Sequence, residues 1–264
     1  METSVLSTLE VKIIALVTRD YKERSRKADF SAHFENILKY CDEKGCDSIL
    51  FSPYTFFYGY RIKRDALNRL KNIKIIFIEK FRQIYNPIDQ SKYYIFFRNG
   101  ESWDKYETKQ FLARIENPRS FKKNLLAEFR SEFKSTRLFL NFALLICGEI
   151  NIVKYSKSLK TIEDSYSFIR EIPNNIEIII NPIHDRMTRF EMGLKKKFLS
   201  SQNRIVVSVW NRGKKFKDGK SRDGNNPSWS IYKNGDEIIV PREDIPFDTG
   251  KSRIEIGILK ISKY

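Results

Sequence analysis

Short, nearly continuous apolar runs rich in β-branched residues restrict the fold of this chain more than any other feature. Such runs cover residues 11–17, 48–52 and 73–78, and segments with helical spacing at about 31–44 and 64–70 lie between them. Runs of this kind suit strands that are buried on both faces, and their alternation with helices is typical of a parallel sheet. The sequence therefore predicts an α/β fold.

The remaining segments continue this pattern with a different strand order. A hairpin is predicted at 93–108 around Asn99-Gly100, and a strand over 138–146 ends at Cys147. Helices are predicted at 162–171 and 187–201, and strands at 176–180, 204–210, 229–232 and 254–259. No repeat or low-complexity linker divides the chain, so we expect residues 1–264 to form a single domain with mixed strand order.

The sequence argues against membrane, secreted and metal-dependent classes. The apolar runs are too short to cross a bilayer, and the N-terminus lacks the basic and apolar regions of a secretory signal. The three cysteines and the two histidines, His33 and His184, show no metal-ligand spacing, and neither histidine is assigned a role. We therefore expect a reduced, cytoplasmic protein with no metal or other cofactor.

The chain is strongly basic. Lys and Arg number 49 against 33 Asp and Glu, a net charge of +16. Such a charge attracts anionic substrates, nucleic acid or an acidic protein, although a solvated lysine-rich surface is the alternative. The densest basic segment, residues 212–222, contains glycines that allow close approach to a ligand. Its anion-binding candidates are Lys214, Lys215, Lys217, Lys220 and Arg222, against the alternative of a solvated loop.

Cys147 is the candidate nucleophile. It follows the apolar run 138–146 and precedes Gly148-Glu149, so its thiol lies where a buried strand turns toward solvent. A free thiol has a pKa of about 8.5 and needs a neighbouring base to react at neutral pH. Lys109, which lies 38 residues earlier, is the candidate source of positive charge for a developing oxyanion.

The order of these motifs resembles the nitrilase superfamily of carbon–nitrogen hydrolases over nearly the whole chain. The motifs are Gly45–Pro53 with Gly59-Tyr60, Tyr106-x-x-Lys109-x-x-Leu112, Leu144-Leu-Ile-Cys147-Gly-Glu149 and a later strand ending at Asn211-Arg212-Gly213. The resemblance implies a four-layer αββα sandwich with two mixed sheets, assembled into dimers. It also implies a Glu base, a catalytic Lys at Lys109 and a Cys147 thioester.

The sequence departs from the family pattern at the base. Tyr54 follows Pro53 where the family has glutamate, and no acidic residue lies between Asp47 and Asp65. A phenol with a pKa near 10 is a poor base at neutral pH. Glu116, Glu128 and Glu132 are the candidate replacements, with a solvated charged loop as the alternative. Glu149 is expected to orient the turn after Cys147.

Two functions remain open from these residues. The first is hydrolysis of a small-molecule amide or nitrile, through Cys147, Lys109 and a recruited acid such as Glu116. The alternative is a catalytically impaired binding or regulatory protein, whose basic surface takes nucleic acid or an acidic partner. An unrelated nucleic-acid-processing enzyme is disfavoured, because the sequence shows no acidic metal-ligand cluster and no phosphate-binding glycine loop.

Overall fold

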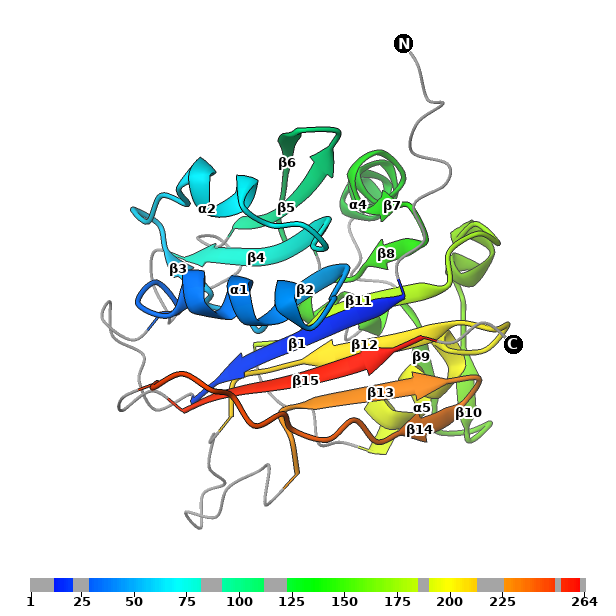
Figure 1. The fold of residues 1–264 in the computed structure, drawn as a ribbon. Helices are drawn as coiled ribbons and strands as arrows, with labels where there is room; N and C mark the ends of the chain where they lie inside the picture. Colours follow the sequence, from blue (N-terminus) through cyan, green and yellow to red (C-terminus); the bar gives the residue numbers. More distant parts are fainter. Residues whose placement is uncertain are drawn as a thin grey trace.

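Two mixed β-sheets pack face to face, and helices cover both outer faces (Figure 1). The computed structural model describes residues 12–20, 29–81, 92–111, 123–184, 190–212, 226–249 and 253–261. The predicted α/β class with two mixed sheets is confirmed. Within the described residues the layers run helix, sheet, sheet, helix, which is the αββα order.

The first sheet has the strand order β15-β1-β2-β4-β5-β6, and β3 pairs with β4. Its strands are β1 (Ile13–Arg19), β2 (Ser48–Phe51), β3 (Phe56–Phe57), β4 (Ile75–Phe81), β5 (Lys92–Asn99), β6 (Ser102–Thr108) and β15 (Ile254–Lys260). β1, β2 and β4 run parallel, and antiparallel β15 and β5 flank them. The β5–β6 hairpin turns at Gly100, whose φ of 60° is readily adopted by glycine.

The second sheet has the order β14-β13-β12-β11-β8-β7. Its strands are β7 (Leu138–Phe139), β8 (Phe142–Leu144), β11 (Ile178–Pro182), β12 (Ile205–Val209), β13 (Trp229–Lys233) and β14 (Asp236–Ile238). Here β8, β11 and β12 run parallel, so each sheet has a parallel centre with antiparallel edges. A separate hairpin contains β9 (Lys154–Ser156) and β10 (Thr161–Glu163).

Helices pack on the outer face of each sheet. α1 (Phe34–Glu43) and α2 (Arg64–Asn68) cover the first sheet, whereas α4 (Lys123–Thr136) and α5 (Phe190–Leu199) cover the second. Two 3-10 helices, η3 (Cys147–Ile152) and η4 (Phe168–Glu171), follow β8 and β10. In the described part of the chain, no helix is long and apolar enough to span a membrane.

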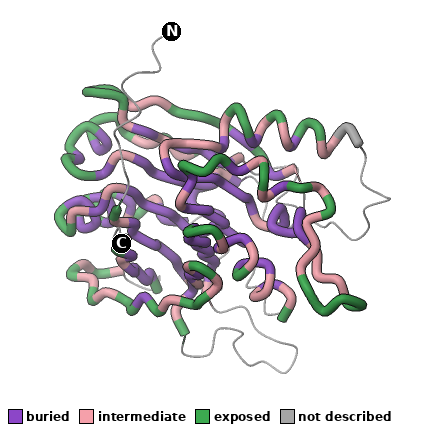
Figure 2. Tube along the Cα trace, turned by 90° about the vertical axis from the view of Figure 1, so that its right-hand side faces the viewer, coloured by how far each residue is buried: buried purple, intermediate pink, exposed green. Residues whose placement is uncertain are grey.

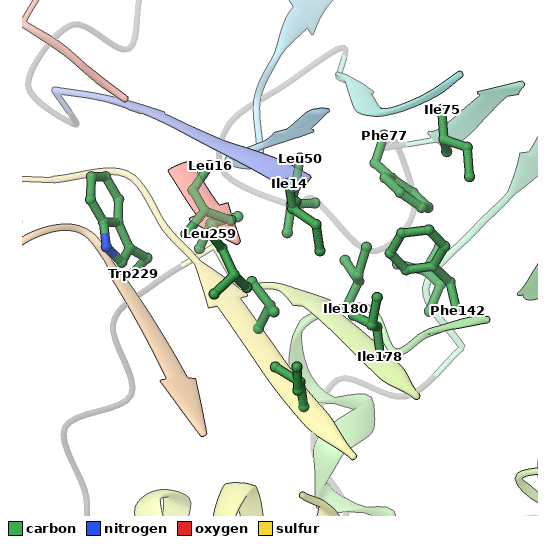
Figure 3. Packing of buried hydrophobic residues seen from close by; sticks show 14 of the residues in the cluster. Ile14, Leu16, Leu50, Ile75, Phe77, Phe142, Ile178, Ile180, Trp229 and Leu259 are labelled. Carbon is green, nitrogen blue, oxygen red and sulfur yellow. The ribbon is translucent and has the colours of Figure 1, made fainter. Parts of the chain in front are cut away.

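Alternating side chains of the strands build separate cores on the two sides of each sheet. Ile75 and Phe77 of β4 face the second sheet, while Ile76 and Ile78 face α1 and α2. Phe77 meets Phe142 of β8 edge to face, with ring centroids 5.5 Å apart (Figure 3). The central strands of both sheets are accordingly buried, whereas the helices are partly exposed (Figure 2). Each large apolar side chain buried in this way contributes about 1.5–3 kcal/mol.

Two predicted elements are wrong. The run 138–146 forms two antiparallel strands, β7 and β8, because Leu140 has a φ of 51° and turns the chain between them. Residues 162–171 form the end of β10 and then η4 instead of one helix. Ser167, with a φ of 54°, interrupts the chain there, and the Asp164 carboxylate accepts the amides of Phe168 and Ile169 at 2.8 Å.

One helix was not predicted. The charged stretch before β7 contains α4, whose Phe129 and Phe133 recur at four-residue spacing and pack beneath the second sheet. Charged residues on the remaining faces of the helix obscured this spacing. The helix ends at Thr136, directly before the buried Arg137.

The carboxyl ends of the two parallel strand groups meet at one edge of the molecule. Beyond β2 and β12, Ser52 Oγ donates to Asn211 Oδ1 at 2.6 Å and Asn211 Nδ2 donates to the Pro53 carbonyl at 2.8 Å. The Arg212 amide also donates to the Arg19 carbonyl at the end of β1, at 2.8 Å. Ligand and catalytic sites of α/β proteins commonly lie at such an edge.

Candidate active site

Cys147 lies at this edge, in a turn that begins η3. β8 ends at Leu144, and Cys147 follows with a φ of 48°, a region that residues with a Cβ rarely adopt. Asn181 Nδ2 donates to the carbonyls of Leu145 and Cys147, at 2.6 and 3.2 Å. The Cys147 thiol is free and half-buried, whereas Cys41 and Cys46 are fully buried. Backbone strain of this kind is concentrated at functional sites.

The buried carboxylate of Glu149 holds the Cys147 turn in place. Glu149 is completely buried, and its Oε2 accepts the Ile146 amide at 2.7 Å. Its Oε1 accepts the Phe111 amide at 2.8 Å, which ties the turn to the segment after β6. Burial raises the pKa of Glu149, while Arg137 and the backbone donors act in the opposite direction. Glu149 therefore accepts several hydrogen bonds at once and fixes the backbone on both sides of the contact, at Ile146 and at Phe111.

Arg137 completes this cluster as its permanent cation. Its side chain is completely buried and Nη1 forms an ion pair with Glu149. Nε donates to Thr108 Oγ1 at 3.1 Å, and Nη2 donates to the Lys109 carbonyl. A guanidinium stays charged at all physiological pH values and offers its donors in a fixed fork. This geometry connects the end of β6 in the first sheet to the Cys147 turn in the second.

His184 lies just beyond β11, the strand that pairs in parallel with β8 before Cys147. It is 8% exposed, and the charge of Cys147 acts on its imidazole. Nε2 lies 2.7 Å from Oε1 of Glu79 and 3.3 Å from the hydroxyl of Tyr93. The ring of Tyr54 packs against the imidazole, with centroids 4.9 Å apart. The imidazole is thus enclosed by four side chains from both sheets.

The surroundings of His184 favour its charged form. Burial by itself lowers the pKa of this histidine. The negative charge of Glu79, the charge of Cys147 and the hydrogen bond to Glu79 outweigh burial and raise the pKa of His184 to about 10. Burial, together with the charge of Glu79, raises the pKa of Tyr93 well above its usual value. At neutral pH His184 therefore holds its second proton, and Tyr93 stays neutral.

Glu79 is oriented by the turn that follows β2. The carboxylate is 1% exposed, and its Oε2 accepts the backbone amide of Tyr54. Tyr54 has a φ of 60°, which points this amide at the carboxylate, and Arg19 Nη2 donates to the Tyr54 carbonyl at 3.2 Å. The Glu79 amide in turn donates to Thr55 Oγ1 at 2.9 Å. Tyr54 thus contributes its backbone to Glu79 and its ring to His184.

The structure separates several of the residues predicted from sequence. Lys109 directly follows β6 and is exposed, with Nζ lying 5.2 Å from the centre of the Phe111 ring. Glu128 and Glu132 lie on α4, where Glu128 is exposed and Glu132 Oε1 accepts the Thr136 hydroxyl at 2.8 Å. Glu116 and the basic candidates Lys214, Lys215, Lys217, Lys220 and Arg222 lie outside the described residues.

Sequence reasoning missed His184 and Glu79. Metal-ligand spacing gives His184 no role, but its position just after the apolar strand 176–180 is a usable signal. Glu79 directly follows the apolar run 73–78, and a carboxylate at the end of a buried strand requires a partner. Among the described residues, no group of three or more His, Cys, Asp or Glu side chains could hold a metal ion.

Comparisons with known proteins find similarity at the level of structure only. No protein-family model and no curated protein sequence matches the chain. The chain is similar to a carbon–nitrogen hydrolase from Helicobacter pylori G27, at 11% identity and a TM-score of 0.47, over 94% of this chain and 89% of that one. Two further similar structures are an amidase of the nitrilase superfamily and a NitFhit protein.

The amidase, from Nesterenkonia AN1 and carrying a cysteine-to-alanine mutation, is 8% identical with a TM-score of 0.49, over 94% of this chain and 90% of that one. The NitFhit protein of C. elegans is 13% identical with a TM-score of 0.49, over 94% of this chain and 60% of that one. Because these identities are low, the roles of individual residues are inferred from the geometry of this chain.

Proposed function

We propose that this protein is a cysteine-dependent hydrolase that cleaves the carbon–nitrogen bond of an amide through a thioester on Cys147. The observation that carries the proposal is the position of the thiol. Cys147 is half-buried in a strained turn where the parallel strands of both sheets end, and the titratable imidazole of His184 follows the adjacent parallel strand β11. Nucleophiles of acyl-transfer enzymes need this combination of access, fixed direction and a neighbouring proton acceptor.

Lys109 is the proposed source of positive charge for the tetrahedral intermediate, as the family resemblance implies. Its support is the backbone connection: Arg137 binds the Lys109 carbonyl and also Glu149, two residues after Cys147. The Lys109 side chain is exposed and would move from Phe111 toward the substrate on binding. Donors aimed at an oxyanion contribute about 3 kcal/mol in comparable sites.

An anionic amide is the proposed substrate class. The net charge of +16 provides a long-range attraction for anions, and this attraction weakens as salt screens it. A substrate that carries a carboxylate should therefore show a higher kcat/KM than its neutral analogue at low salt. The two values should converge when the salt concentration is raised.

The test measures ammonia release from a panel of primary amides, each offered in carboxylate-bearing and neutral form. Cys147→Ala should abolish turnover, and the acyl group should appear on Cys147 by intact mass and peptide mapping after rapid quenching in acid. Cys41→Ala is the matched control, because Cys41 lies on α1 and its buried side chain packs against the first sheet. If no amide or nitrile is hydrolysed and Cys147 forms no adduct, the hydrolase proposal is wrong and a binding function is favoured.

A further inference from the structure

The family resemblance leaves Cys147 without a base, because Tyr54 stands where the glutamate is expected. We propose that His184 is the catalytic acid–base of Cys147 and that Glu79 orients it, forming a Cys–His–Glu site assembled across the two sheets. This inference rests on the proposed role of Cys147 as a nucleophile. It replaces Glu116, Glu128 and Glu132 as the candidate proton acceptors.

The hydrogen bonds of His184 determine which ring nitrogen faces each partner. Nε2 lies 2.7 Å from Glu79 Oε1, so Nε2 carries a hydrogen that it donates to this carboxylate. Nδ1 is then the nitrogen left to exchange a proton with the thiol of Cys147, because Cys147 and His184 follow the adjacent parallel strands β8 and β11. A carboxylate that fixes the tautomer and stabilises the imidazolium is the third member of known triads.

Glu79 acts through His184, and its geometry excludes direct contact with substrate. Its carboxylate is almost fully buried, with Oε2 on the Tyr54 amide and Oε1 on His184. Both oxygens are therefore occupied within the protein, which makes Glu79 a positioning residue. Tyr54, which replaces the expected base, still contributes by holding Glu79 through its backbone.

The proton balance of amide hydrolysis closes with these residues alone. The cycle begins from a thiolate–imidazolium pair, in which the proton of the Cys147 thiol is held on Nδ1 of His184, and the thiolate forms a C–S bond with the carbonyl carbon. The imidazolium then protonates the leaving nitrogen as the C–N bond breaks, which releases the amine and leaves a thioester. Water attacks the thioester while His184 takes its proton, and the C–S bond breaks to restore the thiolate–imidazolium pair. The sum is amide plus water to acid plus amine.

Every group that faces His184 is compatible with this cycle. Glu79 on β4 and the Cys147 thiolate stabilise the imidazolium, and Tyr93 on β5 remains a neutral hydroxyl. Tyr54 contributes a ring face, whose negative quadrupole also favours a cation. The environment thus stabilises the protonated histidine that forms when the thiol is ionised.

The test follows alkylation of Cys147 by iodoacetamide from about pH 5 to pH 10, read by intact mass and peptide mapping, and requires no substrate. At pH 6.5, His184→Gln should lower the alkylation rate at least about tenfold relative to the unmodified protein. The difference should shrink above about pH 8.5, where solvent ionises an ordinary thiol without assistance. His33→Gln is the matched control, because it changes the other histidine, at the start of α1, and should leave the whole profile unchanged.

Glu79→Gln supplies a second variant in case His184→Gln does not fold. The amide retains the shape of the carboxylate and removes its charge, so the rate at pH 6.5 should lie between those of the unmodified protein and His184→Gln. If folded His184→Gln, or folded Glu79→Gln where His184→Gln fails to fold, keeps the original profile, the inference is wrong. Should neither variant fold, the unmodified protein decides: a rate that rises about tenfold per pH unit up to pH 8.5 overturns the inference, and a rate that changes little supports it.

The outcomes also separate this inference from the proposed function. A thiol activated by His184 in a protein that hydrolyses no amide would support the Cys–His–Glu site and reject amide hydrolysis. Amide turnover that requires Cys147 and survives His184→Gln would support the function and reject His184 as the acid–base.

Discussion

Two fully buried carboxylates, Glu79 and Glu149, belong to the candidate site and differ mainly in their partners. Each accepts a backbone amide from a strained turn at a strand end, Glu79 from the turn at Tyr54 and Glu149 from the turn at Cys147. Glu79 is paired with His184, which can gain and lose a proton, whereas Glu149 is paired with Arg137, which cannot.

The difference in partners assigns Glu79 to the reaction and Glu149 to the stability of the site. A carboxylate that faces a histidine stabilises a proton that has been taken from a nucleophile, so its contribution is to the reaction. A carboxylate that faces a buried arginine keeps a constant charge balance and holds backbone in place. Altering the first pair should therefore change rates, and altering the second should change stability.

The largest effect is expected for His184→Gln on turnover. Loss of the acid–base should lower kcat about 100-fold to 10,000-fold in the fraction of the variant that remains folded, whatever the change in its free energy of unfolding. Steady-state kinetics on an amide identified as substrate, alongside urea denaturation, measure both quantities. A variant that loses stability and activity in equal proportion would indicate that the His184 pair is structural, and the contrast with Arg137 would disappear.

Arg137→Met should show the opposite balance. Removing one member of a completely buried ion pair leaves Glu149 uncompensated and should lower the free energy of unfolding by about 3–5 kcal/mol. Arg69→Met is the matched control, because the Arg69–Glu35 pair is largely exposed and should contribute about 1 kcal/mol or less. Urea denaturation measures both variants. Similar losses in the two would show that the buried pair adds no more than a surface pair.

The pH dependence of stability should reveal the pairing of His184 with Glu79. His184 has a pKa near 10 in the folded protein, against about 6.5 for an unfolded histidine. The folded state therefore binds this proton more tightly, so its stabilisation is complete below about pH 6.5 and is lost as the pH rises through 10. The melting temperature of the unmodified protein should fall between these limits more steeply than that of His184→Gln.

Cys147→Ala tests the cause of this dependence. The variant removes one of the two negative charges that raise the pKa of His184 and leaves Glu79 in place. Its melting temperature should fall with pH less steeply than that of the unmodified protein and more steeply than that of His184→Gln. Identical slopes in all three proteins would contradict the raised pKa.

The sequence predicts the layers of this fold because the strands carry their signal locally. Residues 11–17 and 73–78 are apolar on both faces, and the structure buries one face of each strand between the sheets and the other beneath helices. Prediction fails where the signal is mixed with a turn. Residues 138–146 read as a single strand because nothing in the composition marks the positive φ of Leu140.

The candidate site is less predictable because its members come from distant strands. Cys147 stands out from its own neighbourhood, at the end of an apolar run followed by glycine. Glu79 and His184 are 105 residues apart in the chain and meet only when the two sheets pack. A search restricted to the expected position beside Pro53 finds Tyr54 and no acid, and the carboxylate that this turn binds is 25 residues further on.

The smallest predicted effect concerns the strained turn at Cys147. The φ of 48° costs a residue with a Cβ about 1–2 kcal/mol, and glycine avoids this cost while losing about 0.5–1 kcal/mol through its more flexible unfolded chain. Cys147→Gly should therefore be more stable than Cys147→Ala by about 0.5–1 kcal/mol, measured by urea denaturation. At Cys46, which has a negative φ, the same two substitutions should rank in the opposite order.

Comparison of the two cysteine positions isolates the backbone term, because both pairs of variants differ by the same methyl group. If glycine is worse at both positions, the Cys147 turn stores no strain, and Glu149 would merely accept bonds from a relaxed loop. If glycine is better only at Cys147, the Arg137–Glu149 pair holds the thiol in a conformation that the backbone disfavours. Glu149 would then hold the Cys147 turn in a strained conformation, and Glu79 would act on the same sulfur through His184.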